Sequence, residues 1–498
     1  MSAMFAPIYT TAQVRELESA APPDAPRLME RAGLAAAEYA RAMAGNVRRV
    51  LVVAGPGNNG GDAFEVAVHL KRWFYSVAVM FAGNRARLSD DASTALAKWE
   101  RAGGGTATSI SPGGRWDLVI DGLFGIGLER PLEGHYADLV DNINALRVPV
   151  LALDIPSGIN ADTGAVMGRA VRATRTITFV GLKPGLLTLD GPDHCGEVHS
   201  DSLGLDAEAL RPPRGRLLND GVLPASLGPR PKNFHKGLAG SVAILGGATG
   251  MVGATVLAGR AALKCGAGRV YLALLTGKSP RIDYVQPELM LRSPEEALGG
   301  DEMTVVAAGP GMGRNDDAKA ALRRALELPS ALVLDADALN LIGEDAVLAE
   351  ITAKRRGPTL LTPHPAEAGR LLGSSTRAVQ NDRVAAALAV ADRYRAYSAL
   401  KGNGTLIAAP DGRWWINRTG NAGMASAGMG DALTGLVAGL LAQGVSPIDA
   451  LLAGVWLHGA AGDAVARAHG GLLGVTASEV IESARALLNR SIYPATAR

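Results

Sequence analysis

Short apolar runs alternate with longer stretches of helical periodicity through most of the chain. In the first half, the runs that predict buried parallel strands are residues 49–54, residues 77–81 and the segments that end at Asp121 (DLVID) and Asp154 (VLALD). Residues 12–43 are predicted to be helical, because Leu28, Met29 and Leu34 recur at helical spacing. A second helix is expected from the glycine-rich segment after residue 54 to about Trp73.

The alternation breaks over residues 210–233, which are rich in Pro, Arg and Gly and typical of a linker with local turns. It then resumes, with predicted strands at residues 241–245, 270–274, 304–308, 331–334 and 359–361, a hairpin from 405–409 to 413–416, and a buried helix at 431–443. Strands that alternate with helices predict an α/β fold. A chain of 498 residues is too long for one ordinary core, so we expect two domains, residues 1–215 and 220–498.

Composition narrows the class of protein. Charged residues make up 20% of the chain and the formal net charge is +2, which gives no argument for nucleic acid or an acidic membrane surface as a partner. The two cysteines, Cys195 and Cys265, lie far apart, so we expect neither a disulfide framework nor a zinc site. We expect no signal peptide and no transmembrane segment, and a cytoplasmic location.

A first glycine-rich loop, Gly55-Pro-Gly-Asn-Asn-Gly-Gly-Asp62, follows the first strand and opens a helix. Such a loop lets backbone N–H groups approach a phosphate. Its G-x-G-x-x-G spacing matches the dinucleotide fingerprint, but the acidic residue expected about 20 residues later is missing, since the chain reads FAGNR over residues 81–85. No GK[ST] follows, which excludes a P-loop.

The polar residues Asn58, Asn59 and Asp62 distinguish this loop from a simple turn. Their amide and carboxylate groups could contact a ligand, although shaping the turn is the alternative. Asp121 and Asp154 each follow a strand and should lie at the same edge of the sheet. There they could hold a cation or act as acid and base, with a helix cap or turn as the alternative.

The motifs GPGNNGGD, DGLFGIG and LDIPSGINADTG, with LMERAG upstream, resemble those of the NAD(P)H-hydrate epimerase domain over roughly residues 5–210. The resemblance implies a Rossmann-like three-layer fold that interconverts the C6 epimers of hydrated NADH or NADPH. It implies substrate contacts from Asn58, Asn59, Gly60, Gly61 and Asp62 and from Gly125, Ile126, Gly127, Leu128, Glu129, Arg130 and Pro131. It also implies a potassium site at Asn59, Asp121 and Ser157, and Asp154 as the acid/base. The chain departs from the family at Ala63-Phe64, where glycine and a smaller residue are usual.

A second glycine-rich loop, Gly428-Met-Gly-Asp431, opens an apolar helix. Its amides could stabilise a transferring phosphoryl group, and Asp431 could deprotonate an attacking hydroxyl. Lys401-Gly-Asn-Gly-Thr405 supplies a cation, loop amides and a hydroxyl for a nucleotide phosphate. His364 lies between two prolines before a helix, where a structural role is the alternative. The carboxylates of Asp335-Ala-Asp337 could orient magnesium or cap a helix.

Together HKG, GPGMG, DADALN, TPHPAEAGRLLG, KGNGT and GMGD resemble the ADP-dependent NAD(P)H-hydrate dehydratase family over about residues 220–498. The resemblance implies a ribokinase-like α/β fold. It implies that Ala254, Gly311, His364 and Asp431 contact the hydrated nucleotide, and that Lys401, Gly402, Asn403, Gly404, Thr405 and Gly430 hold the adenine nucleotide. Met429 stands where threonine or serine is usual, but the backbone amide survives that change.

These resemblances imply one pathway in two steps. Asp431 would help phosphorylate the C6 hydroxyl of one epimer at the expense of ADP, with Mg²⁺, and the ring nitrogen would then expel phosphate. The first domain, with K⁺, would supply that epimer from the other. Three competing hypotheses remain at this point: a ribokinase-like small-molecule kinase, an N-terminal domain that only binds nucleotide, and an NAD-linked dehydrogenase. The sequence leaves a homo-oligomer open.

Overall fold

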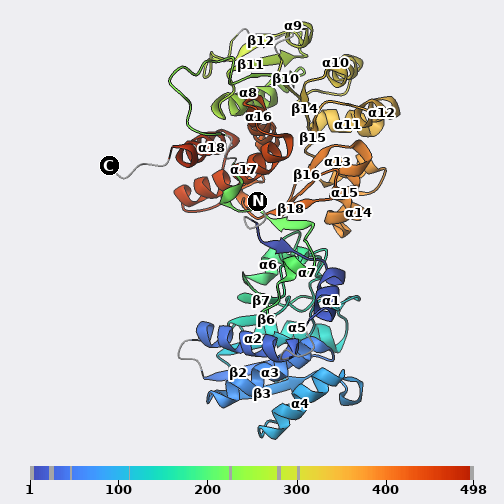
Figure 1. Cartoon of the computed structure of the whole chain (residues 1–498), viewed down its shortest axis with the longest axis vertical. Helices are drawn as coiled ribbons and strands as arrows, with labels where there is room; N and C mark the ends of the chain where they lie inside the picture. Colours follow the sequence, from blue (N-terminus) through green and yellow to red (C-terminus); the bar gives the residue numbers. More distant parts are fainter. Residues whose placement is uncertain are drawn as a thin grey trace. The chain divides into compact units, whose positions relative to one another are not determined.

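The structure, a computed structural model, describes residues 5–21, 27–44, 48–111, 113–223, 227–277, 282–299 and 303–493 (Figure 1). The chain divides into two compact units. One unit comprises Ala6–Gly215, and the other comprises Arg216–Arg498 together with the first five residues. Each unit is built around its own sheet and core.

A parallel sheet in the order β4-β3-β2-β5-β6-β7-β8 forms the centre of the N-terminal unit. Its strands are β2 (Arg49–Ala54), β3 (Ser76–Phe81), β4 (Thr106–Ala107), β5 (Leu118–Gly122), β6 (Val150–Leu153), β7 (Arg175–Phe179) and β8 (Glu197–Asp201). The chain starts in the middle of this sheet and moves outward on both sides of β2, which is the Rossmann-like arrangement. The four strands predicted from apolar runs are all present.

Helices cover both faces of this sheet. The elements outside the sheet are β1 (Pro7–Ile8), α1 (Thr11–Ser19), α2 (Leu28–Ala44), α3 (Asn58–Arg72), η1 (Arg85–Arg87), α4 (Asp90–Arg101), α5 (His135–Ala145), η2 (Pro184–Leu186), α6 (Gly191–Cys195) and α7 (Ala207–Leu210). Apolar residues of α2, α3 and α4 pack on one face with Val50 and Val52. Residues of α5 pack on the other face with Leu51 and Val53, as the alternation of side chains along a strand requires.

The prediction of one continuous helix over residues 12–43 is wrong. α1 ends at Ser19, and α2 begins at Leu28. The sequence between them carries Pro22, Pro23 and Pro26. Proline in a helix interior removes a backbone donor and clashes with the preceding turn, so helical periodicity of the side chains cannot carry a helix through such a stretch. Residues 22–26 lie outside the described part of the chain.

The sheet of the C-terminal unit runs in the order β18-β17-β16-β15-β14-β13-β10-β11-β12. Its strands are β10 (Ser241–Gly246), β11 (Arg269–Leu274), β12 (Met290–Arg292), β13 (Val305–Ala308), β14 (Ala331–Leu334), β15 (Thr359–Leu361), β16 (Tyr397–Leu400), β17 (Thr405–Ala408) and β18 (Trp414–Asn417). The strands from β12 to β16 are parallel, whereas β17 and β18 form the predicted antiparallel hairpin. The segment predicted as a linker contains β9 (Gly215–Leu217) and η3 (Asp220–Val222).

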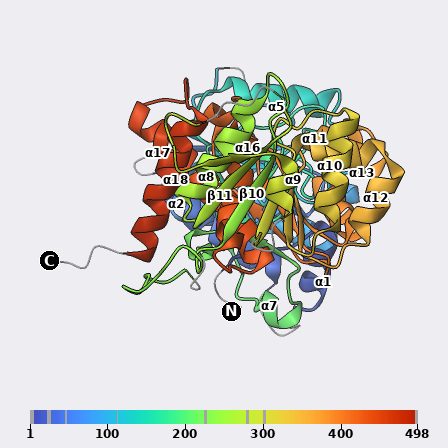
Figure 2. The same ribbon diagram turned by 90° about the horizontal axis from the view of Figure 1, so that it is seen from above.

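Two helical layers enclose this sheet. Figure 2 shows α8, α17 and α18 on one side of β10 and β11, and α10, α12 and α13 on the other. The helices are α8 (Val252–Lys264), α9 (Pro294–Leu298), α10 (Asp316–Glu327), α11 (Ala336–Glu344), α12 (Ala346–Ala353), α13 (Pro365–Leu372), α14 (Thr376–Asn381), α15 (Arg383–Tyr394), η4 (Ala422–Met424), α16 (Met429–Ala442), α17 (Pro447–His469) and α18 (Ala477–Ile492). The predicted helix at 431–443 corresponds to α16, whose residues from Ala432 to Ala442 are buried.

Both units are therefore three-layer α/β structures, and the predicted fold class is confirmed. In each unit the strand order reverses beside the first strand, between β2 and β5 and between β10 and β13. Ligands of open α/β sheets bind outside the carboxyl ends of the strands at such a point. The segments GPGNNGGD, DGLFGIG, GPGMG and KGNGT lie at the ends of β2, β5, β13 and β16, so they lie at these edges, whereas the loop Gly428–Asp431 follows η4 and opens α16. Among the described residues, no helix has the length and apolarity needed to span a bilayer.

Candidate functional sites

A cavity of about 1010 Å³ opens at the carboxyl edge of the N-terminal sheet. It is lined by residues from α1, α2, α3 and α4 and from the loops that follow β2, β5, β6 and β8. The predicted site residues that line it are Asn58, Asn59, Asp62, Gly125, Ile126, Gly127 and Asp154. The cavity is large enough for a nucleotide, whose usual pockets measure about 300–1,000 Å³.

The glycines of the first loop are required by close backbone packing. A Cβ atom on Gly60 would lie 2.0 Å from the carbonyl oxygen of Gly55, and one on Gly55 would lie 1.7 Å from that of Leu123. Gly61 packs against Met29. The loop therefore folds tightly over the end of β2, which leaves the following side chains, Asn58 and Asn59, at the cavity.

Asn58 and Asn59 differ in their partners. The side-chain oxygen of Asn58 accepts a hydrogen bond from Ser89 Oγ at 2.7 Å. Asn59 is buried, and neither its side-chain oxygen nor its nitrogen has a hydrogen-bond partner among the described residues. An unpaired buried amide is costly, so Asn59 is suited to a ligand rather than to shaping a turn.

Asp121 and Ser157 form a buried pair. Ser157 Oγ donates to Asp121 Oδ1 at 2.6 Å, and the backbone N–H of Ser157 donates to Oδ2 at 2.9 Å. Burial raises the pKa of Asp121, although the hydrogen bonds from Ser157 oppose that shift. The bonds fix the loops that follow β5 and β6 against each other, because Phe124 N also donates to Ser157 Oγ.

Asp154 is held in an unusual conformation. Its φ is +66°, a region that residues other than glycine seldom occupy and that costs about 1–3 kcal/mol. Lys183 Nζ lies 2.5 Å from Asp154 Oδ1, and Thr178 Oγ1 donates to the same oxygen at 3.2 Å. The other oxygen, Oδ2, faces Gly125 and the cavity. One oxygen is thus anchored, and the other is available to a ligand.

Besides Asp154 and the exposed Asp91, two carboxyl groups line the same cavity, Glu18 of α1 and Asp62 of α3. Burial and the negative charges of Asp154 and Glu18 raise the pKa of Asp62 well above its usual value. Burial and Asp154 also raise the pKa of Glu18. The cavity therefore combines a lysine-paired carboxyl group with carboxyl groups whose pKa values are raised, and such differing environments are typical of general acid–base sites.

The predicted loop from Gly125 to Pro131 is only partly at the cavity. Leu128 is buried in the core that contains Leu51 and Val53. Glu129, Arg130 and Pro131 are exposed and do not line the cavity. Geometry therefore brings the first three residues of this loop to the site and leaves the last four beside it.

The second site lies where α16 begins. Its N-cap residue, Gly428, has φ +89° and provides no side-chain cap. The first N–H groups of a 14-residue helix thus lack the usual capping oxygen, and together with the helix dipole they favour an anion. Burial and the charge of Asp335 raise the pKa of Asp431, in the first turn of this helix, to about 6.

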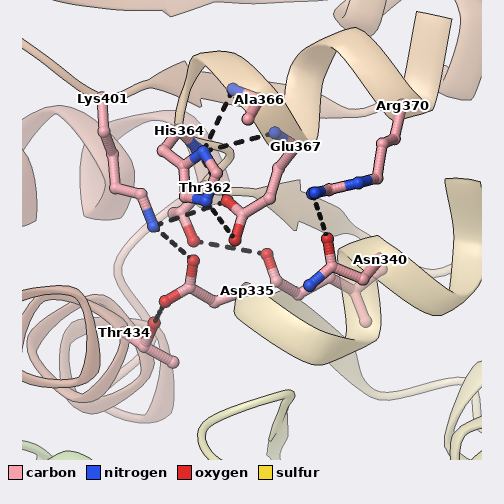
Figure 3. A network of polar contacts seen from close by, with 10 residues as sticks. Asp335, Asn340, Thr362, His364, Ala366, Glu367, Arg370, Lys401 and Thr434 are labelled. Atoms are coloured by element: carbon pink, nitrogen blue, oxygen red, sulfur yellow. Dashed lines mark hydrogen bonds and ion pairs between the residues drawn. The ribbon is translucent and has the colours of Figure 1, made fainter. Parts of the chain in front are cut away.

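Asp335 connects this helix to the loop after β16. Lys401 Nζ lies 2.6 Å from Asp335 Oδ1, and Thr434 Oγ1 of α16 donates to Oδ2 at 2.9 Å (Figure 3). Burial alone would lower the pKa of Lys401, but the charges of Asp335 and Glu367 outweigh it and raise that pKa. Asp335 makes no side-chain cap for α11, so of the two alternatives for this carboxylate the helix cap is not observed, and the side chain is instead a charge partner of Lys401.

His364 is the N-cap residue of α13. Its Nδ1 accepts hydrogen bonds from the backbone N–H groups of Ala366 and Glu367, so the ring proton is on Nε2, which lies 3.2 Å from Glu367 Oε1. Burial raises the pKa of Glu367 to about 7. Figure 3 shows the His364 ring and the Glu367 carboxyl directed toward Asp335 and Lys401. The structural role of His364, the alternative to ligand contact, is thus observed, and its exposed ring still lies beside Glu367 and the Lys401 cluster.

The other predicted residues lie around this cluster. Gly430 is close to both charges, since a Cβ atom there would lie 3.3 Å from Asp335 Oδ2 and 3.5 Å from Lys401 Nζ. Gly311 and Ala254 are neighbours, with 3.2 Å between the Cβ positions. Gly402, Asn403, Gly404 and Thr405 follow Lys401 in the same loop, and Gly402 and Asn403 are exposed.

Sequence reasoning missed Lys183, Glu18 and Glu367. Lys183 lies in an apolar segment after β7, with no motif that marks it as a partner of Asp154. Glu367 stood inside the TPHPAEA motif, three residues after His364, which is the spacing of a capping box and could have indicated it. Glu18 reaches the cavity from α1, which is distant in sequence from the other lining residues.

Two family models match the chain, and they cover different parts of it. Residues 25–185 match the YjeF-related protein N-terminus, and residues 242–485 match NAD(P)H-hydrate dehydratase. The first match contains Asn59, Asp121 and Asp154, and the second contains Asp335, Lys401 and Asp431. The folds and sites thus define an α/β enzyme with two separate nucleotide-type sites.

Relatives extend over nearly the whole chain. The bifunctional NAD(P)H-hydrate repair enzyme of Escherichia coli (strain K12) is 38% identical over 93% of this chain and 90% of its own length. The corresponding enzyme of Coxiella burnetii is 38% identical over 97% of this chain and 99% of its own length. A crystal structure of an ADP/ATP-dependent NAD(P)H-hydrate dehydratase from Bacillus subtilis, co-crystallised with ATP and Mg²⁺, is 32% identical, with a TM-score of 0.48, and covers 53% of this chain and 95% of that one.

The chain therefore belongs to the family of bifunctional NAD(P)H-hydrate repair enzymes, with an epimerase domain followed by a dehydratase domain. This membership favours the repair hypothesis over the small-molecule kinase, the nucleotide-binding scaffold and the dehydrogenase.

Proposed function

We propose that residues 1–215 carry the epimerase and residues 220–498 carry an ADP-dependent dehydratase that acts on the S epimer. The observation that carries the proposal is that each unit has one cluster of charged side chains at the carboxyl edge of its sheet. One cluster is centred on Asp154 and the other on Asp335, Lys401 and Asp431.

In the epimerase, we assign substrate contacts to the lining residues Asn58, Asn59, Asp62, Gly125, Ile126 and Gly127. The neighbouring Gly60, Gly61, Leu128, Glu129, Arg130 and Pro131 complete the two loops that would enclose the ligand. Inverting C6 requires that a bond from C6 to oxygen or to nitrogen break and re-form on the other face. Either route needs a group that takes and returns a proton, and Asp154 Oδ2 is the oxygen that supports this role.

Asn59, Asp121 and Ser157 fit a potassium ion. The side-chain oxygen of Asn59 is buried without a partner among the described residues, and Asp121 and Ser157 add hard oxygen atoms. A bound K⁺ would supply positive charge beside the substrate and fix the loops that carry these three residues.

In the dehydratase, the C6 hydroxyl attacks the β-phosphorus of ADP while Asp431 takes its proton. The bond from that phosphorus to the bridging oxygen breaks, so AMP leaves. The ring nitrogen then expels phosphate from C6, and loss of a proton from C5 restores the reduced ring. We assign the hydrated nucleotide to Ala254, Gly311, His364 and Asp431, and ADP to Lys401, Gly402, Asn403, Gly404, Thr405 and Gly430.

The residues present do not fit a resident magnesium ion. Both oxygens of Asp335 are engaged, by Lys401 and by Thr434. No cluster of three or more His, Cys, Asp or Glu side chains suited to a metal occurs in the described part of the chain. We therefore expect Mg²⁺ to arrive on the phosphates of ADP, a mode that is common for this ion.

We also propose a cytoplasmic location for the protein. The two buried cysteines form no disulfide, which fits the reducing cytoplasm.

The test is the recovery of reduced-cofactor absorbance from a mixture of hydrate epimers with ADP, Mg²⁺ and K⁺. We expect complete recovery with the whole chain. With Asp154→Asn, recovery should stop when one epimer is exhausted, apart from spontaneous epimerisation. No recovery with ADP or with ATP would contradict the proposed function.

A further inference from the structure

A buried arginine contacts the loop that we assign to ADP. Arg383, the first residue of α15, is only 1% exposed. Burial lowers its pKa to about 10, so the guanidinium still carries its charge at neutral pH. Burying a charge is costly unless hydrogen bonds compensate, and in this chain those bonds go to the loop of residues 400–404.

The guanidinium of Arg383 donates hydrogen bonds to several backbone carbonyl groups. Arg383 Nη2 donates to the carbonyl oxygens of Leu400 and Lys401 at 3.3 Å each and to that of Gly404 at 3.5 Å. Nη1 donates to Gln380 Oε1 at 2.7 Å, which fixes the plane of the group. Thr405 Oγ1 donates to the carbonyl oxygen of Gly402 at 3.0 Å. The carbonyl groups of Leu400, Lys401 and Gly404 are therefore directed toward Arg383, whereas Thr405 binds that of Gly402.

The direction of a carbonyl group determines the direction of the next amide in the loop. Among the described residues no peptide bond is cis, and in a trans peptide the C=O of one residue and the N–H of the next point in opposite directions. The N–H group of Gly402, which shares a peptide with the Lys401 carbonyl, is thus directed away from Arg383. Gly402 is exposed. An outward amide in a glycine-rich turn can donate a hydrogen bond to an anion.

Glycine is needed for this arrangement. Gly402 has φ +137°, which side-chain-bearing residues rarely adopt, and a Cβ atom there would lie 3.0 Å from both terminal nitrogens of Arg383. The loop and the guanidinium thus pack directly against each other. Lys401, whose carbonyl Arg383 binds, directs its ammonium group to Asp335 on the other side.

We propose that Arg383 is a positioning residue for ADP: it binds the carbonyl groups of Lys401 and Gly404 from inside and so presents the amide of Gly402 to a phosphate of the nucleotide. This inference rests on the proposed dehydratase function and adds a residue that the motif KGNGT does not contain. Lysine cannot replace it, because an ammonium group lacks the planar fork that reaches several carbonyls at once.

The chain offers a matched control in Arg355. This side chain also donates to a row of carbonyl oxygens, those of Ala325, Leu326, Leu328 and Ser330. Burial lowers its pKa to about 10 as well. Arg355 holds a turn between α10 and β14 and makes none of its hydrogen bonds with the Lys401–Gly404 loop. Loss of Arg355 should cost stability without changing ADP binding.

The experiment measures steady-state dehydratase kinetics and calorimetric binding of Mg²⁺–ADP for the whole chain and for Arg383→Lys and Arg355→Lys. We expect both variants to unfold at lower temperature than wild type. Only Arg383→Lys should raise the KM for ADP, by tenfold or more, with kcat reduced less than threefold. Gln380→Met, which leaves the buried charge in place, should raise that KM about threefold and serves if Arg383→Lys does not fold.

An unchanged KM for ADP in Arg383→Lys, or in Gln380→Met where the former does not fold, would overturn the inference. An equal rise in Arg355→Lys would overturn it too, because the effect would then come from general loosening. If wild type binds Mg²⁺–ADP but regenerates no reduced cofactor, the proposed function fails, and weaker calorimetric binding by Arg383→Lys would still support the loop assignment. No Mg²⁺–ADP binding by wild type would overturn it.

Discussion

Lys183 Nζ lies 2.5 Å from Asp154 Oδ1, and both groups are buried in the N-terminal unit. Lys183 also donates to Thr178 Oγ1 at 2.8 Å and to the carbonyl oxygen of Phe179 at 2.7 Å. This pairing keeps one oxygen of Asp154 away from the cavity while the other faces it. The lysine therefore determines which atom of Asp154 meets the ligand.

Lys183→Met should impair epimerisation and spare dehydration. Without the ammonium group, the carboxylate of Asp154 loses its partner and its fixed orientation, so we expect a loss of about 10²–10⁴-fold in epimerisation, the usual contribution of a positioned acid/base. The rate at which each hydrate epimer equilibrates, followed by chromatography without ADP, measures this effect. Dehydration of pure S epimer by the same variant should be within twofold of wild type.

The reciprocal variant is Asp431→Asn, which should lose dehydration and keep epimerisation. Wild-type epimerisation by Lys183→Met would show that the lysine serves only the stability of the unit.

The dehydratase should lose activity in acid. Burial and the charge of Asp335 raise the pKa of Asp431 to about 6, and the base must be ionised to accept a proton. kcat/KM for the S epimer should therefore fall about tenfold from pH 7 to pH 5, because only about one tenth of such a group is ionised at pH 5. Glu367, whose pKa is about 7, also titrates here, so the profile is repeated with Glu367→Gln. If the acid-side fall in kcat/KM disappears in Glu367→Gln, the group that titrates is Glu367 and not Asp431.

The edges of the sheets were predictable from sequence because parallel strands place all their carboxyl ends together. The apolar runs before Gly55, Asp121 and Asp335 therefore sufficed to place these residues at the carboxyl edges of the two sheets. The charge partners were not predictable in the same way. Lys183 reaches Asp154 from 29 residues away, and Arg383 reaches the Lys401 loop from a helix, so only tertiary packing reveals them.

The sequence pattern predicted one helix incorrectly, and the effect of one departure from the family pattern stays untested. Helical periodicity suggested one helix over residues 12–43, but proline chemistry overrides periodicity. Ala63-Phe64, which departs from the family pattern, is fully buried, and Phe64 packs against Phe81 with 5.5 Å between ring centroids. The larger side chain is thus part of the core between α3 and β3.

Asp335→Asn should destabilise the C-terminal unit far more than an equivalent change at the surface. The Asp335 side chain is 2% exposed and pairs with Lys401, so removing its charge leaves a largely buried ammonium group without its closest partner. Breaking such a pair typically costs about 3–5 kcal/mol. The control is Glu350→Gln, which breaks an exposed pair with Lys354 and should leave the stability nearly unchanged, because water and salt screen exposed pairs. Urea unfolding of both variants checks the difference, and equal losses would contradict it.

Gly60→Ala should damage the N-terminal unit, whereas Gly57→Ala should be tolerated. A Cβ atom on Gly60 would lie 2.0 Å from the carbonyl oxygen of Gly55, and backbone cannot move away cheaply. Nothing lies within 4 Å of a Cβ atom on Gly57. We expect a loss of about 1–3 kcal/mol or more for Gly60→Ala, by analogy with overpacked cores, and less than about 0.5 kcal/mol for Gly57→Ala. Thermal unfolding together with the epimerisation rate compares the two.

Potassium should stabilise the N-terminal unit through Asn59. The buried amide of this residue has no partner among the described residues, so an ion that binds its oxygen relieves an unfavourable burial. At 100 times the dissociation constant, the ion should add about 2.7 kcal/mol to the stability of the unit. Melting of the whole chain in KCl and in choline chloride at equal ionic strength measures this, and the transition of the N-terminal unit should rise in KCl. Asn59→Ala should remove the difference, whereas Asn58→Ala, whose side chain bonds Ser89, should keep it. A potassium effect that persists in Asn59→Ala would place the ion elsewhere.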